Sequence, residues 1–205
     1  NDVSTLTVLG GYTYQSVVND GFGASNNNFL TDAFEANNLG AGLGIRANPN
    51  LLGSYKNQYK LVSFLARAQY SLLNKYFATV NVRRDGSTKF GDNNKWGIFP
   101  SVSVGWTLSE EAFLKGNSTI DNLKLRVSWG QTGNFLIPNY ASIGLLNPSN
   151  YTFGGVETNG IAPITISNQD LSWEKTSSTN IGLDFAFLDD RIYGSIEYFK
   201  SVTSD

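Results

Sequence analysis

The side chains with the most chemical potential in this sequence are its arginines and carboxylates, because the chain contains no histidine and no cysteine. Histidine is the commonest general base and metal ligand, so its absence rules out a Ser-His-Asp triad within these residues. The absence of cysteine removes thiolate nucleophiles, thiolate metal sites and disulfides. We therefore expect no catalytic, cofactor-binding or metal-binding residue here.

The densest group of charges, Arg83, Arg84 and Asp85, lies in the segment RRDGSTKFG. Such a group could hold a polar ligand through charge-assisted hydrogen bonds. A structural role competes with this one, because Asp85 and Gly86 favour a turn and Arg83 could be solvated or ion-paired on its strand. For each residue taken alone, the sequence favours the structural role.

Two further candidates, Lys124 and Arg126, fall on the polar side of a predicted strand. Ion pairs between neighbouring strands are the default role for such charges. Other charges with the same expected role are Arg67, Asp184 and Glu197. The candidate ligand-binding residues are therefore Arg83, Arg84, Asp85, Lys124 and Arg126.

Aromatic residues in the connecting segments could stack on a flat ligand such as a sugar ring. Packing of a loop on itself is the commoner role for an aromatic side chain, and we expect that role here. The residues concerned are Tyr55, Tyr59, Phe135, Tyr140, Tyr151, Phe153 and Trp173.

Strands must position these side chains, because seven segments alternate apolar and polar residues with the period of two that marks a strand with two different faces. These segments are residues 3–14, 62–72, 76–83, 96–106, 123–130, 181–187 and 192–199. The fourth is the clearest. One of its faces carries Trp96, Ile98, Pro100, Val102, Val104 and Trp106, and the other carries Gly97, Phe99, Ser101, Ser103 and Gly105.

The connections between these segments alternate in character. Residues 15–59, 86–95 and 134–172 are rich in Asn and Gly and predict loops, whereas Asn74-Lys75 and residues 189–191 predict tight turns. The remaining link predicts a helical turn over residues 110–114, capped by Ser109. In an up-and-down arrangement, alternate connections lie at opposite ends of the sheet. One end therefore carries the loops and the other the short links.

Composition and aromatic placement favour a membrane-spanning sheet. Charged residues are only 16% of the chain and aromatic residues reach 13%. The polar faces carry mostly small neutral residues, and aromatic residues gather at strand ends, as they do at the two edges of a bilayer. A tilted membrane strand needs about 9–11 residues, which Trp96 to Trp106 supplies. The net charge of −2 gives no electrostatic case for nucleic acid.

We therefore predict an all-β fold, an antiparallel up-and-down transmembrane β-barrel wall of about seven strands. Seven strands leave a barrel open, so further strands are expected outside a chain that begins within a strand pattern and lacks Met. All of residues 1–205 would belong to this one domain. A soluble secreted β-sandwich that binds glycans is the alternative. A glycosidase with paired carboxylates is the weakest option, because no acidic cleft is visible.

Three segments carry a resemblance to a known family. They are SFLARAQYSLLNKYFATVNVRRDGSTKFGDNNKWGIFPSVSVGWTLSEEAFL (63–114), LKLRVSWGQTGN (123–134) and LSWEKTSSTNIGLDFAFLDDRIYGSIEYF (171–199). Together they resemble the SusC/RagA family of TonB-linked outer-membrane proteins of Bacteroidota. The resemblance covers most of residues 60–200, and residues 15–59 and 134–170 match only loosely.

The resemblance implies an importer in the outer membrane of a Gram-negative bacterium. Family members have a large barrel, usually of 22 strands, that is closed by an N-terminal plug. A SusD-like surface lipoprotein caps the barrel, and the cargo is a glycan or a peptide. Energy reaches the plug and its TonB box from TonB, ExbB and ExbD. On this reading the loops lie outside the cell, and Phe99, the one bulky residue on its polar face, is expected to pack against the plug.

Overall fold

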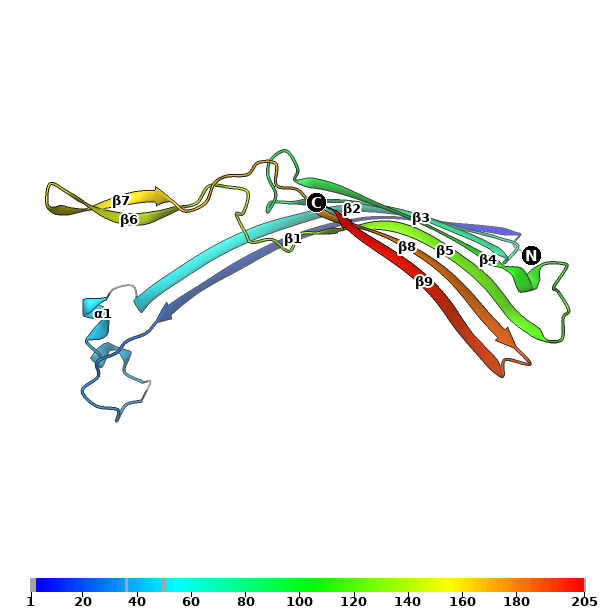
Figure 1. Ribbon diagram of the computed structural model, residues 1–205, viewed down its shortest axis with the longest axis horizontal. Coiled ribbons are helices and arrows are strands. Elements are labelled where there is room, and N and C mark those ends of the chain that lie inside the picture. Colours follow the sequence, from blue (N-terminus) through cyan, green and yellow to red (C-terminus); the bar gives the residue numbers. More distant parts are fainter. Residues whose placement is uncertain (1–2, 36, 49–50, 205) are drawn as a thin grey trace. The chain divides into compact units, whose positions relative to one another are not determined.

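Seven antiparallel strands form one sheet, in which neighbours in space are neighbours along the chain except where β8 follows β5 (Figure 1). The computed structural model describes residues 3–35, 37–48 and 51–204. The strands of this sheet are β1 (Ser4–Ala24), β2 (Leu52–Leu72), β3 (Tyr76–Ser87), β4 (Trp96–Thr107), β5 (Ile120–Asn134), β8 (Glu174–Phe187) and β9 (Ile192–Ser204). The predicted all-β antiparallel meander is confirmed. A two-layer sandwich is not formed, because the one other sheet among the described residues is a hairpin of two strands.

The hairpin consists of β6 (Leu146–Phe153) and β7 (Val156–Pro163), and it lies inside the connection between β5 and β8. The sequence predicts residues 134–172 as a long loop rich in Asn and Gly, and the hairpin within it is a feature that the sequence did not predict. Gly154 and Gly155 make the hairpin turn with φ angles of 61° and 83°. Glycine adopts such angles without a steric penalty, so the turn is encoded locally.

The chain divides into two compact units, Asn1–Gln15 with Lys60–Asp205, and Ser16–Tyr59. The second unit holds the C-terminal part of β1, the N-terminal part of β2 and the short helices η1 (Leu39–Ala41) and α1 (Gly44–Ala47). Asn26 ties this unit together, because its side chain donates to the carbonyls of Leu39 and Gly42 at 2.6 and 2.8 Å.

The predicted loop 15–59 is therefore too long at both ends. The strand β1 continues to Ala24, and β2 already begins at Leu52. Both faces of these extensions are polar or exposed, so they lack the period-two pattern that marks the rest of each strand. Cross-strand side-chain bonds support the pairing instead, with Gln58 donating to Ser16 at 3.0 Å and Asn19 donating to Asn57 at 3.3 Å.

The end of the sheet where β2–β3, β4–β5 and β8–β9 are joined is called the turn end, and the opposite end of β3–β5 and β8 is the loop end. The β2–β3 turn centres on Leu73 and Asn74, whose φ angles of 54° and 55° identify a type I′ turn. This turn begins one residue earlier than the predicted Asn74-Lys75. The amide of Lys75 closes the turn by donating to the Leu72 carbonyl at 3.0 Å.

The link from β4 to β5 also differs from the prediction. A 3-10 helix, η3 (Leu108–Glu110), begins directly after β4, and its N-cap residue is Thr107 with no side-chain capping bond. The predicted helical turn at 110–114 is present one residue later, since the amide of Lys115 donates to the Glu111 carbonyl at 2.7 Å. The predicted cap is wrong, because Ser109 lies inside η3. The helices in the described part of the chain are all too short and too polar to span a membrane.

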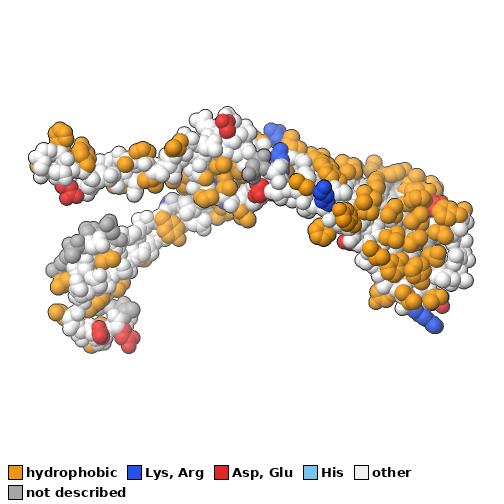
Figure 2. Space-filling model, viewed as in Figure 1, with side chains coloured by type: hydrophobic (Ala, Val, Ile, Leu, Met, Phe, Trp, Pro, Cys, Tyr) orange, Lys and Arg blue, Asp and Glu red, His pale blue; other side chains and the backbone are white. Residues whose placement is uncertain are grey.

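The two faces of the sheet differ as the alternation predicts. Along β4, Trp96, Val104 and Trp106 are exposed while Gly97 and Phe99 are buried. The face that carries Trp96 and Trp106 is called the apolar face, and the face that carries Gly97 and Phe99 is the polar face. Figure 2 shows apolar side chains crowded over the end of the sheet at which β8 and β9 are joined. Exposed apolar surface on this scale marks an interaction site and not a soluble exterior.

The aromatic core of the first unit lies on the polar face at the loop end. Phe90, Phe99 and Trp173 are buried together, and the Trp173 ring lies 4.5 Å from that of Phe90 and 5.3 Å from that of Phe99. A β-carbon at Gly97 or Gly133 would lie only 2.5 or 2.1 Å from the Phe99 ring, so glycine is required there. Phe99 thus packs against loop residues of its own chain, which the predicted contact with a plug did not anticipate.

Candidate functional site

A row of polar side chains crosses the polar face from strand to strand. Arg67, Asn81 and Ser101 are opposite one another in β2, β3 and β4. The Arg67 Nε donates to Asn81 Oδ1 at 2.6 Å, and the Asn81 amide donates to Ser101 Oγ at 2.9 Å. Because the residues occupy one cross-strand row, the strand register itself aligns these donors and acceptors.

Nearer the loop end, Arg83 and Asp85 form a tight ion pair on the same face. The Arg83 Nε donates to both carboxylate oxygens of Asp85 at 2.7 and 2.8 Å, and its terminal nitrogen donates to Ser63 Oγ at 3.1 Å. Asp85 is buried and Ser63 has no exposed surface, whereas half of the Arg83 side chain stays exposed. The pair therefore fixes the guanidinium at one position without removing it from contact with a ligand.

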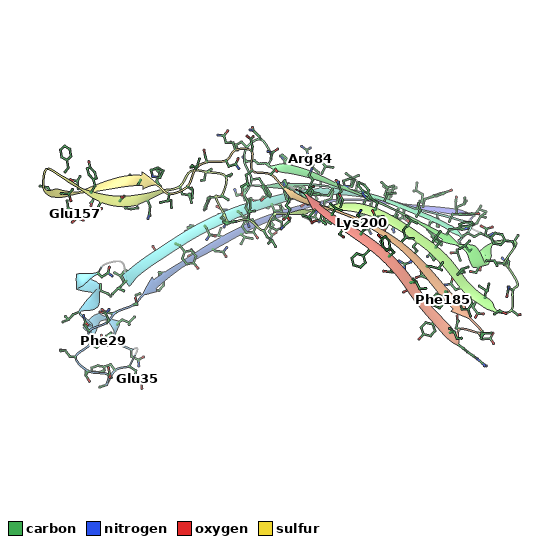
Figure 3. The ribbon with its side chains drawn as sticks, in the orientation of Figure 1. Phe29, Glu35, Arg84, Glu157, Phe185 and Lys200 are labelled. Carbon is green, nitrogen blue, oxygen red and sulfur yellow. The ribbon has the colours of Figure 1, made fainter. Side chains whose placement is uncertain are left out.

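Arg84 belongs to the opposite face, although the sequence grouped it with Arg83 and Asp85. Its guanidinium lies 4.7 Å from the centre of the Trp96 ring, an arrangement that attracts through the cation–π interaction. The same ring covers Gly86, where a β-carbon would lie 2.8 Å from the indole. Figure 3 shows Arg84 near the loop end of the sheet and Phe185 toward the turn end of β8.

Arg126 is held by carboxylates from two neighbouring strands. It contacts Asp184 of β8 through two hydrogen bonds of 2.7 and 2.8 Å and Glu197 of β9 through one of 2.7 Å. Lys124 lies two residues away with its ammonium 4.5 Å from the centre of the Phe77 ring. The expected ion pairing between strands is thus present for Arg126, while Lys124 lies against an aromatic ring.

A cleft of about 580 Å³ opens on the polar face between these groups and the aromatic core. Arg67, Arg83 and Asp85 supply its charged lining, and Phe99, Phe135 and Trp173 supply its aromatic lining. Lys124 and Arg126 line a separate, smaller hollow of about 270 Å³. The structure therefore divides the sequence candidates into two groups on the polar face, with Arg84 outside both.

Three loop segments are bound to one another and are named the loop cluster: residues 88–95, 134–138 and 170–173. Two of their residues, Phe135 and Trp173, line the cleft. The buried Lys89 donates to the carbonyls of Ile137 and Phe135 at 3.0 and 3.4 Å. The Trp173 indole donates to the Lys95 carbonyl at 3.2 Å. The expectation that Trp173 and Phe135 pack their own loops is borne out, whereas sequence reasoning missed Lys89 and Phe90.

The groups that line the cleft suit ligand binding. Arginine donors, a carboxylate, amides and aromatic faces converge on the cleft, and these groups suit recognition of a polar or ring-bearing solute. Among the residues that the structure describes, no group of three or more acidic side chains is placed to hold a metal ion.

A second polar cluster lies at the turn end on the apolar face. One carboxylate oxygen of Glu111 accepts hydrogen bonds from the Tyr76 hydroxyl at 2.6 Å and the Trp106 indole at 3.0 Å, and the other lies 3.5 Å from the Lys75 ammonium. The hydrogen bonds from Tyr76 and Trp106 hold the pKa of Glu111 below its ordinary value of 4.5. One signal for this cluster is present in the sequence, an acid five residues after a strand-end tryptophan.

Comparison with known proteins gives one consistent result. The family model described as TonB dependent receptor-like, beta-barrel matches residues 2–205. TonB-dependent receptor P3 of Formosa agariphila is 36% identical over 98% of this chain and 20% of its own length. TonB-dependent receptor SusC of Bacteroides thetaiotaomicron is 41% identical over 74% of this chain and 16% of its own.

A solved structure described as the RagAB peptide transporter matches with a TM-score of 0.85 and 30% identity, over 99% of this chain and 22% of that one. The chain therefore spans about a fifth of the length of the relatives that it matches.

We expect Trp173→Ala to loosen the loop cluster, because the change removes an aromatic side chain from the core and leaves a cavity. Substitutions of this kind cost about 3–5 kcal/mol. Hydrogen exchange of the backbone amides in residues 88–95, measured in the full-length protein, should accelerate markedly. Phe153→Ala in the exposed hairpin is the matched control and should leave those amides unchanged. Equal exchange in both variants would contradict the packing role of Trp173.

The lowered pKa of Glu111 predicts how its contribution to stability depends on pH. The carboxylate is ionised above its ordinary pKa in both folded and unfolded protein, so its full contribution is present at neutral pH. That contribution should begin to decrease as the pH falls below 4.5, because the unfolded chain takes up the proton first, and it should be lost once the pH has fallen through the lower folded pKa. The stability difference between the natural protein and Glu111→Gln, from urea unfolding, should therefore shrink on acidification. A difference that grows at low pH would refute this assignment.

Proposed function

This chain belongs to the TonB-dependent receptor β-barrel family, of the SusC/RagA type, and on that premise we propose that it forms part of the barrel wall of an outer-membrane importer for large nutrients. The resemblance drawn from residues 63–114, 123–134 and 171–199 is thereby confirmed. The family consists of receptors and transporters and not of enzymes, so the glycosidase alternative is excluded. The protein would reside in the outer membrane of a Gram-negative bacterium.

The observation that carries the proposal is the separation of the two faces of the sheet. The apolar face is exposed along β4, where Trp96, Val104 and Trp106 all face outward from the sheet. The polar face carries the Arg67–Asn81–Ser101 row and the Arg126 cluster. A barrel wall between lipid and an aqueous lumen requires this division, because each strand alternates between the two environments.

Aromatic pairs at the two ends of the apolar face support the same arrangement. Phe64 and Trp96 stack at the loop end, with ring centres 6.2 Å apart, and Tyr76 and Trp106 stack at the turn end at 6.4 Å. From Trp96 to Trp106 the strand advances roughly 33 Å, or roughly 25 Å along the membrane normal at a tilt of about 40°. This distance matches the height of the apolar band of outer-membrane barrels.

The orientation follows from the lengths of the connections. Outer-membrane barrels have short turns on the periplasmic side and long loops outside the cell. The turn end, with its type I′ turn at Leu73-Asn74, would therefore face the periplasm, and the loop cluster would face outward.

In this proposal the cargo is an oligosaccharide or a peptide, and the polar face forms part of its path. The half-exposed Arg83 and the aromatic lining of the cleft suit contact with either cargo class, while the Arg126 cluster stabilises the wall. A SusD-like lipoprotein would meet the outward loops, and TonB with ExbB and ExbD would act through a plug. The RagAB structure, named as a peptide transporter, supports the peptide arm of this proposal.

Import by the full-length receptor tests the proposal. Deletion of its gene should abolish growth on one class of cargo, oligosaccharides or peptides, offered as the sole carbon source, and deletion of TonB should have the same effect. Re-expression of the receptor is the control and should restore growth. A full-length protein that stays in the aqueous phase without detergent would refute the proposal and revive the soluble glycan-binding module.

The assignment of faces predicts opposite tolerance at adjacent residues of β5. Val127→Arg places a charge in lipid and should lower the stability of the folded receptor by about 2–4 kcal/mol near the bilayer midplane. Ser128→Arg points into the lumen and should cost much less. Urea unfolding of the full-length receptor in lipid vesicles measures both values. Equal losses in the two variants would reverse or abolish the face assignment.

A further inference from the structure

A groove on the apolar face at the turn end carries an inference beyond transport. Its volume is about 460 Å³, within the range of roughly 300–1,000 Å³ found for pockets that hold small ligands. The residues that shape it are Tyr70, Tyr76, Ala78, Val104, Trp106 and Leu125. It lies entirely in the unit that contains β3, β4 and β5.

The groove exists because small side chains stand between large ones. Tyr70, Ala78 and Val104 form one cross-strand row through β2, β3 and β4. The next row toward the turn end contains Tyr76 and Trp106, whose rings stack 6.4 Å apart. Ala78 leaves a depression with aromatic side chains on two sides, and the depression opens toward the space that lipid would fill.

The other end of the same face shows that this depression is specific. At the loop end Gly86 would leave a similar gap, but the Trp96 ring covers it and Arg84 lies over the ring. No side chain fills the corresponding space above Ala78 in the described part of the chain, because that space is the groove itself. The two aromatic ends of the sheet are therefore not equivalent.

The polar end of the groove holds the ion pair of Lys75 with Glu111. Because Glu111 accepts from both the Tyr76 hydroxyl and the Trp106 indole, it fixes the two aromatic side chains that border the groove. Its contact with the Lys75 ammonium is long, at 3.5 Å, and about a fifth of the Lys75 side chain remains exposed. An ammonium has three donors, so Lys75 retains the capacity to bind an anionic oxygen beside the apolar groove.

We propose that this groove binds one glycerophospholipid of the periplasmic leaflet, with an acyl chain over Ala78 and the phosphodiester at Lys75. The inference rests on the proposed function, which places the turn end at that leaflet. The chemistry of the two parts of the site identifies the occupant, since a remaining donor of the Lys75 ammonium can bind a phosphodiester oxygen and the apolar groove beside it can hold an acyl chain. Tyrosine and tryptophan are the side chains that favour the headgroup level between these two parts of a lipid.

Native mass spectrometry of the full-length receptor tests the proposal. The receptor is purified in mild detergent and mixed with palmitoyl-oleoyl phosphatidylethanolamine, and the fraction that carries one lipid is measured. Ala78→Leu fills the groove while keeping the face apolar, and the apparent affinity for the first lipid should fall about tenfold. Lys75→Gln removes the cation and should weaken the same adduct. Val80→Leu, on the same face of β3 but outside the groove, is the matched control and should bind as the natural protein does.

Two results would overturn the inference. Equal binding by Ala78→Leu and the natural protein would mean that the groove holds no lipid, and an equal loss in Val80→Leu would mean unspecific contact with the lipid around the barrel. A receptor that imports its cargo but gives either result leaves the proposed function intact and removes only the lipid site. A receptor that remains soluble without detergent removes both.

Discussion

The requirement that every backbone amide and carbonyl find a partner governs this structure. In hydrocarbon no water is available to satisfy an unpaired group, so a sheet can cross a membrane only as part of a closed wall. The ladders that join β2, β3, β4, β5, β8 and β9 supply such partners between neighbouring strands. With the backbone satisfied by pairing alone, the side chains are free to divide between two environments. The apolar face, the polar face and the cleft all follow from that division.

The parts of the fold that alternate between apolar and polar residues could be predicted from the sequence. In β4, for example, Trp96 and Trp106 define a face that the structure exposes, and Gly97 and Phe99 define the face that it buries. The extension of β1 to Ala24 could not be predicted, because nearly all of its residues are exposed and its few apolar ones follow no period of two. Hydrogen-bonded backbone, and not side-chain pattern, specifies such a segment.

The candidate site was predictable in part for a similar reason. Strand parity alone separates Arg83 from Arg84 and places Arg126 on the polar face. The alternation of residues along a strand does not predict which residues pair with Arg126. Its partners Asp184 and Glu197 are 58 and 71 residues away, and their position depends on the register of three strands. The contacts of the loop cluster were harder still to predict from the sequence, since they join loop segments that come together only in the folded protein. Trp173 is buried by contacts with residues that are distant in sequence, so its neighbours along the chain do not predict its burial.

The loop cluster has a consequence for how the strands are held together. Most strands of this sheet pair with the next strand along the chain, so their contacts close short segments and cost little chain entropy. The bonds from Lys89 to Ile137 and from Trp173 to Lys95 instead join residues 48 and 78 positions apart. Each of these bonds therefore closes a longer segment of chain than a turn between neighbouring strands does, and its cost in chain entropy is higher. The loop cluster thus holds together, through side chains, strands that the tight turns do not join directly.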